Sequence, residues 1–312
     1  MQTTSHLLMI RPIAFGFNEE TAINNSFQKD VKDWNANEKA QKEFDDFVTL
    51  LKSYHIDVLV VQDQPQPYTP DSIFPNNWIS MHGDGQIVLY PMFAPNRRPE
   101  RGKGITDKLK AQFTIYSTVD LTAYEKENRF LEGTGSMVLD RVHQKAYACL
   151  SPRTDKKILY DFCEVLDYTP VLFHAFDKKN APIYHTNVMM CIAEDYAIIA
   201  GDTITDMQER ELVLNTLKET GKDIVSISID QMEHFAGNAL QVRNREGQRF
   251  LIMSDSAYHS LTPGQLKKIE TYNPILHASL NTIEQNGGGS ARCMIAEIFL
   301  PPHHLSHQDE SS

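Results

Sequence analysis

The chain has 312 residues, 41% of them hydrophobic and 23% charged, which is an ordinary globular composition for one large core or two modest ones. The formal net charge of −11 argues against a nucleic-acid partner, because binding phosphates needs a basic face. No stretch approaches the roughly 18 apolar residues of a membrane span or an apolar signal-peptide core, so no membrane association is expected.

Weak self-similarity recurs about every fifty residues along the chain. Each unit is predicted to hold two strands around a polar turn, a helix and a closing strand. In each unit the ranges are given in the order first strand, second strand, helix and closing strand. Two units have them at 77–81, 86–90, 107–112 and 114–116, and at 135–139, 145–149, 157–166 and 170–173. Two more have them at 187–191, 196–200, 207–220 and 224–229, and at 238–242, 250–253, 263–271 and from 275. The remaining unit is split between the two ends of the chain, at 293–300, 7–11, 39–54 and 58–61.

Hydrophobic spacing and end signals support these elements. Phe44, Phe47, Val48 and Leu51 approximate helical spacing, whereas 58–61 is a short β-branched run suited to a buried strand. Five units that close on themselves predict an α/β ring around a central cavity, with both chain ends in one unit. Without a long Gly/Ser/Pro-rich linker, residues 1–301 are expected to form a single domain, and 302–312 a flexible polar tail.

The first strands of all five units should begin at the same end of this ring. Their starts carry Asn77, Glu132, His185, Asn238 and Cys293, so these side chains are expected to be neighbours. Cys293 follows three glycines, which allow the backbone to bend and to approach a ligand closely.

Glu132, His185 and Cys293 suit the three roles of nucleophilic catalysis. A cysteine becomes a nucleophile when its pKa is lowered or a base takes its proton, and a histidine can do this and later protonate a leaving amine. A carboxylate holding the histidine would favour the cationic ring. The other cysteines (Cys149, Cys163 and Cys191) lie in apolar patterns, lack CxxC spacing and are expected to be buried thiols in a reducing cytoplasm.

Three motifs carry a resemblance to a known superfamily. Glu132-Gly-Thr-Gly135 looks like a Glu-Gly-Gly-Asp motif, His185-Thr-Asn187 like a His-x-Asp motif, and 287–293 like a glycine-rich cysteine loop. With these motifs the sequence resembles the guanidino-group-modifying enzymes: arginine deiminases, dimethylarginine dimethylaminohydrolases and amidinotransferases. The resemblance implies a five-bladed α/β propeller, the pentein fold, with Cys293, His185 and Glu132 as catalytic residues.

Further segments resemble the substrate-binding parts of the dimethylarginine hydrolases. Asp71-Ser-Ile-Phe-Pro-Asn-Asn77 is similar to their Asp-x-x-Phe-Val-Glu-Asp segment, which implies that Asp71, Asn76 and Asn77 contact substrate. Arg97 and Arg153 match arginines that hold the substrate α-carboxylate. The alternatives to substrate binding are that Asp71 only caps a turn and that Arg97 belongs to a solvent-exposed basic turn.

The departures from that pattern concern substrate charge. Asn76, Asn77 and Asn187 stand where arginine-using relatives have carboxylates. Amides do not offset a buried cation, but they donate and accept hydrogen bonds, so they suit a neutral ureido group such as that of citrulline. The opening segment 9–21 also resembles a citrulline-hydrolysing subgroup of the superfamily.

The sequence therefore predicts a hydrolase without cofactor or metal that uses a cysteine nucleophile on a guanidino or ureido amino acid, with citrulline-type substrates favoured. An amidinotransferase or arginine deiminase remains an alternative, and so does a non-catalytic propeller like the ribosome-binding initiation factors. Such a binding protein has no need of Glu132, His185 and Cys293 together. A metal tract at His303, His304 and His307 is the alternative to a polar tail. A homo-oligomer is left open.

Overall fold

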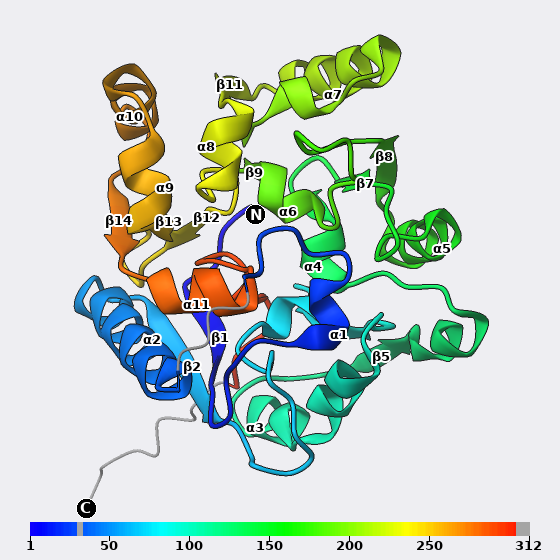
Figure 1. Ribbon diagram of the computed structural model, residues 1–312, viewed down its shortest axis with the longest axis vertical. Coiled ribbons are helices and arrows are strands. Elements are labelled where there is room, and N and C mark those ends of the chain that lie inside the picture. The colour runs from blue at the N-terminus through cyan, green and yellow to red at the C-terminus, as the bar shows by residue number, and fades with distance from the viewer. Residues whose placement is uncertain (30–33, 304–312) are drawn as a thin grey trace, which may run out of the picture.

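The computed structural model describes residues 1–29 and 34–303, where five small sheets surround a common axis (Figure 1). The rest of the predicted tail, with His304 and His307, lies outside the described residues. In each sheet the middle strand is antiparallel to one neighbour and parallel to the other. This arrangement confirms the predicted ring of ββαβ units.

The strands and their order within the sheets are as follows. The sheets are β15 (Ala296–Ile298), β1 (His6–Arg11) and β2 (Asp57–Gln62); β3 (Ile79–Met81), β4 (Gln86–Leu89) and β5 (Ser117–Asp120); β6 (Val138–Asp140), β7 (Lys145–Cys149) and β8 (Thr169–Phe173); β9 (Met190–Ile192), β10 (Tyr196–Ile199) and β11 (Asp223–Ser226); and β12 (Leu240–Arg243), β13 (Arg249–Ser254) and β14 (Ile275–Ala278).

One helix in each unit leads into the closing strand. These helices are α2 (Ala36–Ser53), α3 (Ile105–Lys110), α5 (Lys156–Leu166), α7 (Met207–Glu219) and α10 (Pro263–Glu270). Shorter helices connect the units: η1 (Pro75–Asn77), η3 (Thr122–Glu127), α4 (Gly133–Ser136), α6 (Thr186–Met189), α8 (Ile229–Glu233) and α11 (Asn281–Gly287). Others lie within a unit, between its middle strand and its long helix: α1 (Glu19–Ala22), η2 (Pro95–Gly102), η4 (Gly201–Thr203) and α9 (Asp255–Ser260). None of the described helices is long and apolar enough to cross a membrane.

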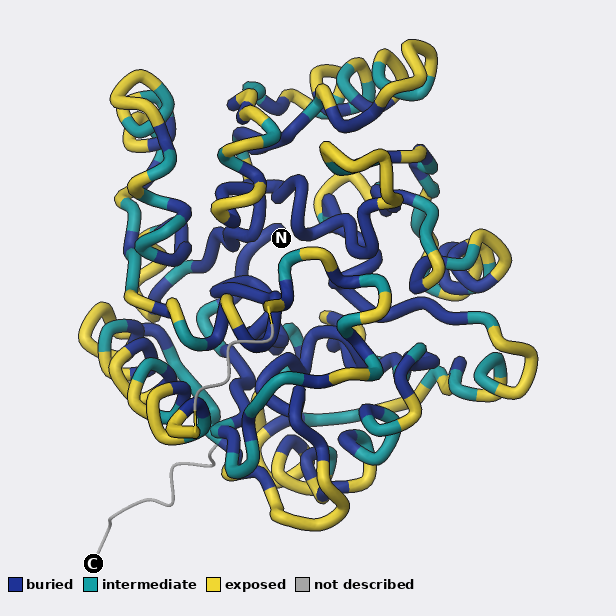
Figure 2. Tube along the Cα trace, in the orientation of Figure 1, coloured by how far each residue is buried: buried dark blue, intermediate teal, exposed yellow. Residues whose placement is uncertain are grey.

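Local sequence explains why the long helices form where they do. In α2 the helical spacing of Phe44, Phe47 and Leu51 places three fully buried side chains on the face toward the strands. Asp155 and Asp206 cap α5 and α7, since each carboxylate accepts two backbone N–H groups of the first turn. The burial pattern follows: strands near the axis are buried, and the outer helices expose one face (Figure 2).

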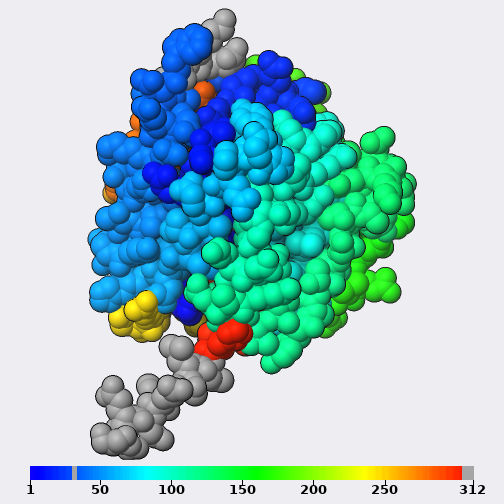
Figure 3. Space-filling view, turned by 90° about the horizontal axis from the view of Figure 1, so that it is seen from below, coloured from blue at the N-terminus to red at the C-terminus, as the bar shows by residue number. Residues whose placement is uncertain are grey.

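The two ends of the chain close the ring in one sheet, as predicted. Leu7 of β1 pairs with Glu297 of β15. At the axis the side chain of Gln2 donates hydrogen bonds to the carbonyls of Leu139 and Ile192, which belong to two other sheets. The last described residues reach the surface as the red patch of Figure 3. Pro302 forms an isolated antiparallel β-bridge with Phe113.

Several predicted boundaries differ from the structure, and those of one closing strand and of the first strands bear on the site. Residues 114–116 were expected to form a closing strand, but Thr114 donates its N–H to the carbonyl of Pro301, and β5 begins only at Ser117. The first strands also begin later than expected, because a short helical turn precedes β3, β6 and β9. These turns carry the predicted site residues.

Candidate active site

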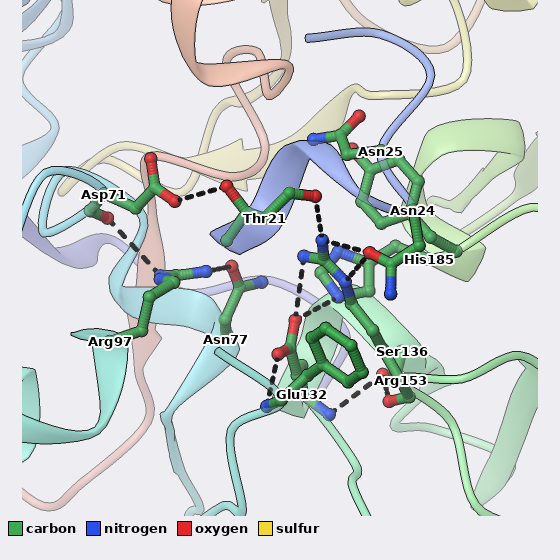
Figure 4. Close-up of polar contacts among 12 residues, drawn as sticks. Thr21, Asn24, Asn25, Asp71, Asn77, Arg97, Glu132, Ser136, Arg153 and His185 are labelled. Carbon is green, nitrogen blue, oxygen red and sulfur yellow. Dashed lines mark hydrogen bonds and ion pairs between the residues drawn. The ribbon is translucent and has the colours of Figure 1, made fainter. Parts of the chain in front are cut away.

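Glu132 and His185 occupy equivalent positions in two neighbouring units. Glu132 is the residue before α4, and His185 is the residue before α6. Each short helix leads directly into the first strand of its sheet, so both side chains project toward the axis. Glu132 Oε2 lies 2.7 Å from His185 Nε2 (Figure 4). The structure therefore brings together two residues that are far apart in the sequence.

Buried charges surround Glu132. Its Oε1 accepts the backbone N–H of Phe93 at 2.9 Å, and Arg153 Nη1 lies 3.4 Å from its Oε2. Burial alone would raise the pKa of Glu132, but the cation of Arg153 and the hydrogen bond from His185 outweigh burial and hold that pKa well below its usual value. Glu132 is thus a carboxylate at neutral pH.

His185 is neutral near pH 7, which differs from the cationic ring expected from the sequence. Burial lowers the pKa of His185 to about 4, because removing the ring from water outweighs the opposing effect of Glu132. Since Glu132 is an anion that only accepts, Nε2 of the neutral ring carries the proton that it donates to this carboxylate, and Nδ1 is left as a proton acceptor.

The packing around Gly135 explains why the motif Glu132-Gly-Thr-Gly135 ends in glycine. A Cβ atom at this position would lie 2.9 Å from His185 Nδ1 and 2.5 Å from Asn77 Nδ2. Any larger residue would push into both side chains. The glycine therefore lets the histidine and the amide pack against the turn that carries Glu132.

Cys293 lies in the turn that precedes β15 and is 4% exposed. Its sulfur accepts hydrogen bonds from Asn238 Nδ2 at 3.2 Å and from Asn187 Nδ2 at 3.5 Å. Two amide donors are thus aimed at the sulfur from the starts of two other units. Among the described residues, no hydrogen bond joins Cys293 to His185. Asn238 starts a predicted unit and was expected to be a neighbour of Cys293, and its amide lies on the sulfur.

Asn76 and Asn77 lie side by side in η1. Asn77 donates from Nδ2 to Asn76 Oδ1 at 3.1 Å and accepts from Arg97 Nη1 at 2.7 Å. Within the described residues, Asn76 Nδ2 and Asn187 Oδ1 are buried without a hydrogen-bond partner. One free amide donor, on Asn76, and one free amide acceptor, on Asn187, are thus available for a ligand, and Asn187 itself contacts the sulfur.

Arg97, which the sequence predicts to contact substrate, is held by internal partners. The guanidinium is 2% exposed and pairs with Glu100, with Nε 2.9 Å from Oε1 and Nη2 3.1 Å from Oε2. It also donates to Asn77 and to the carbonyl of Phe74. A buried cation needs such partners, and a substrate carboxylate would have to displace them.

A segment that the sequence did not assign to the site covers it. This segment, residues 15–29 with α1 at its centre, is called the α1 segment below (Figure 1). Asp71 Oδ2 accepts from Asn18 Nδ2 at 2.7 Å and from the hydroxyl of Thr21 at 3.0 Å. Burial raises the pKa of Asp71, against the opposing effects of Arg97 and these two hydrogen bonds.

The α1 segment also holds Arg153 and the cysteine loop. Arg153 donates to the carbonyl of Thr21 at 2.7 Å and from Nε to Asn24 Oδ1 at 2.8 Å (Figure 4). Asn25 Nδ2 lies 3.4 Å from the carbonyl oxygen of Gly288. Gly288 has a φ of 63°, and a Cβ there would lie 2.5 Å from Asn25 Nδ2. The glycine-rich turn that leads to Cys293 therefore also contacts the α1 segment.

The described residues contain no group of three or more histidine, cysteine, aspartate or glutamate side chains that could hold a metal ion. All four cysteines are free and buried.

Comparison with known proteins places this geometry in a family. The family model for eukaryotic N,N-dimethylarginine dimethylhydrolase matches residues 11–300. No match to a curated protein was found. Among solved structures, ArgZ, an arginine dihydrolase from the ornithine–ammonia cycle in cyanobacteria, has a TM-score of 0.76 and 17% identity over 95% of this chain and 41% of that chain. The present chain thus spans less than half of full-length ArgZ.

Two further structures are similar. The N-terminal domain of ArgZ bound to substrate has a TM-score of 0.74 and 17% identity, covering 95% of this chain and 98% of that chain. A dimethylarginine dimethylaminohydrolase in adduct with S-methyl-L-thiocitrulline has a TM-score of 0.64 and 12% identity, covering 95% of this chain and 100% of that chain. At these identities the likeness shows the shared pentein fold. The family match over residues 11–300 shows that the chain belongs to the N,N-dimethylarginine dimethylhydrolase family, hydrolases of carbon–nitrogen bonds in guanidino compounds.

Proposed function

We propose that this protein hydrolyses the ureido group of a citrulline-type amino acid with Cys293 as nucleophile and without a cofactor. The observation that carries the proposal is a pair of buried amide atoms without a hydrogen-bond partner among the described residues, Asn76 Nδ2 and Asn187 Oδ1; the Asn187 amide also donates to the Cys293 sulfur. A ureido group offers a carbonyl acceptor and amine donors, which match one free donor and one free acceptor. A guanidinium has donors only, and desolvating it among amides is costly.

Substrate attack would begin with proton transfer from Cys293. Neutral His185 accepts the thiol proton at Nδ1, and Glu132 stabilises the imidazolium that forms, through the 2.7 Å hydrogen bond at Nε2. The thiolate attacks the ureido carbon, and the departing nitrogen takes the proton from His185. His185 then removes a proton from water, whose oxygen attacks the thiocarbamate carbon. The carbon–sulfur bond breaks, the thiol is regenerated, and the carbamic acid released decomposes to carbon dioxide and the remaining amine. One citrulline and one water give ornithine, ammonia and carbon dioxide.

Asp71 is the acidic contact in this scheme. Its Oδ2 is held by Asn18 and Thr21, while its Oδ1 is buried and has no hydrogen-bond partner among the described residues. Burial raises the pKa of Asp71, and a cation beside this oxygen would favour its ionised form, which suits the α-ammonium of citrulline. With arginine the guanidinium would be a second cation, and the amides offer no second charge to offset it.

The test is a comparison of kcat/KM for citrulline, arginine, N,N-dimethylarginine, agmatine and succinylarginine, with ammonia and amino-acid products measured. Citrulline should give the highest value. A higher kcat/KM for arginine or dimethylarginine would contradict the proposal. Product formed only with an added amine acceptor would indicate an amidinotransferase. No turnover of any of these compounds would favour the non-catalytic alternative.

Two substitutions test the amide argument directly. Asn77→Asp and Asn187→Asp restore the carboxylates of arginine-using relatives, so each should lower the ratio of citrulline to arginine kcat/KM. Asn128→Asp is the matched control, because Asn128 is exposed in a left-handed turn that aspartate also tolerates. An unchanged ratio in both site variants would refute the amide argument.

A further inference from the structure

A buried carboxylate that the proposed mechanism does not use lies beside the cysteine loop. Glu284, in α11, is 5% exposed. Its Oε1 accepts the hydroxyl of Ser290 at 2.6 Å, and its Oε2 accepts the hydroxyl of Ser256 at 2.7 Å. Burial raises the pKa of Glu284, although the hydrogen bonds from serine hydroxyls oppose this effect. Burial of a carboxylate is unfavourable unless it is hydrogen-bonded, and one of these two bonds reaches the cysteine loop.

Ser290 begins the turn that carries Cys293. Its carbonyl accepts the N–H of Cys293 at 3.0 Å and the N–H of Met294 at 3.3 Å. Ser290 itself is fully buried. The three glycines before it, 287–289, leave the backbone more conformational freedom than other residues would. The hydrogen bond from Ser290 to Glu284 spans these glycines, since its two residues are six positions apart, and so it fixes the end of the glycine stretch.

Glu284 is held in turn by two other parts of the protein. In the first turn of α11, which lies beside α2 (Figure 1), two backbone N–H groups donate to the carboxylate of Glu43 in α2, at 2.8 and 3.1 Å. Ser256, which holds the other oxygen of Glu284, belongs to α9. The turn at Ser290 is therefore connected to α2 and α9 through a single side chain.

The place of this turn decides the place of the sulfur. Asn238 donates to Cys293 Sγ at 3.2 Å and accepts the N–H of Arg292 at 3.1 Å. A turn released at Ser290 would still contact Asn238, but it would lose the contact that fixes its beginning. A shift of about 1 Å in a reacting group can slow a reaction about 100-fold.

We propose that Glu284 is a positioning residue that fixes the nucleophile Cys293 by holding Ser290. The inference rests on the proposed function, in which Cys293 attacks the substrate carbon. In this role Glu284 acts as a hydrogen-bonding partner and not through its charge. A glutamine should therefore replace it, because its oxygen accepts one serine hydroxyl and its amide donates to the oxygen of the other. A leucine of similar size offers no such partner.

The experiment compares citrulline turnover by full-length variants. Glu284→Leu and Ser290→Ala should each lower kcat by about ten- to 100-fold and change KM by less than about threefold, because substrate contacts are kept and the nucleophile is displaced. Glu284→Gln should keep kcat within about threefold of wild type. The matched control is Ser256→Ala, which removes the hydroxyl from the other oxygen of the same carboxylate and should also stay within about threefold. Glu284→Leu combined with Ser290→Ala should be no slower than the slower single variant, because both remove one hydrogen bond.

Hydrogen exchange provides a readout that does not depend on turnover. The N–H groups of Cys293 and Met294, which donate to the carbonyl of Ser290, should exchange about tenfold faster in Glu284→Leu and in Ser290→Ala, as followed by mass spectrometry. They should exchange at the wild-type rate in Glu284→Gln. Peptides from β10 should be unchanged in every variant, which separates a loosened turn from a loss of global stability. If Glu284→Leu does not fold, Ser290→Ala provides both measurements.

Three results would overturn the inference: wild-type kcat in Ser290→Ala, additive losses of kcat in the double variant, or exchange that rises equally in β10 and in the turn. Faster exchange confined to the turn, in a protein whose wild type releases no ammonia from citrulline, would support the role of Glu284 in holding the turn and overturn the proposed function. Citrulline turnover by the wild type with unchanged kcat and exchange in the variants would do the opposite.

Discussion

The buried charge of Glu132 allows a sharp test of how the site is held together. The side chain is fully buried, 2.7 Å from His185 Nε2 and 3.4 Å from Arg153 Nη1. Glu132→Gln keeps the shape but leaves the guanidinium of Arg153 buried opposite a neutral amide. Removing one partner of a buried ion pair costs about 3–5 kcal/mol, so we expect a loss of this size in the free energy of unfolding.

The second arm of this test removes both charges. Glu132→Gln with Arg153→Met retains an apolar stem in place of the guanidinium and should be about 1–3 kcal/mol more stable than the sum of the two single losses, as expected for residues in one network. Glu233→Gln is the control. Glu233 pairs with Lys178 at the surface, and breaking an exposed pair should cost less than about 1 kcal/mol.

The assay is urea unfolding followed by circular dichroism near neutral pH. Every 1.4 kcal/mol corresponds to about a tenfold change in the unfolding equilibrium, so the expected losses are readily resolved. A loss below about 1 kcal/mol for Glu132→Gln, or strictly additive losses in the double variant, would show that Glu132 does not compensate the charge of Arg153. Arg153 would then be free to bind a substrate carboxylate.

Three more outcomes are expected. Burial lowers the pKa of His185 to about 4 from an ordinary value of 6.5, so only the unfolded chain binds this proton between the two values. Protonation of this group therefore leaves the free energy of unfolding unchanged above pH 6.5 and lowers it by about 3 kcal/mol as the pH falls toward 4. Urea unfolding of His185→Gln should not show this fall. Cys293→Ser should keep the fold and lose turnover by about 100-fold or more in an ammonia assay, because a serine hydroxyl stays protonated; a rate near wild type would exclude Cys293 as nucleophile. Gly288→Ala should cost about 1–2 kcal/mol from its left-handed φ and raise KM by displacing Asn25, whereas Gly264→Ala, with open space around it, should not raise KM.

The sequence by itself determined the elements and their order, because local physics specifies them. Helical spacing of Phe44, Phe47 and Leu51 and the caps Asp155 and Asp206 act within a few residues, and the structure places α2, α5 and α7 close to the predicted ranges. Five repeated units also determined the ring. Once the ring exists, the entries to its first strands converge, and so Glu132 and His185 meet.

Only the tertiary structure decided the charge states and partners within the site. Whether His185 is cationic depends on the balance between burial and Glu132, and burial outweighs the carboxylate. The pairing of Arg97 with Glu100, the contact of Asn238 with Cys293 and the docking of the α1 segment likewise depend on distances through space. Sequence patterns report which faces are apolar, but a buried polar atom takes whichever partner the packing brings within about 3 Å. For this reason the catalytic candidates could be named from motifs, whereas the contacts of the α1 segment and the pairing of Arg97 with Glu100 could not.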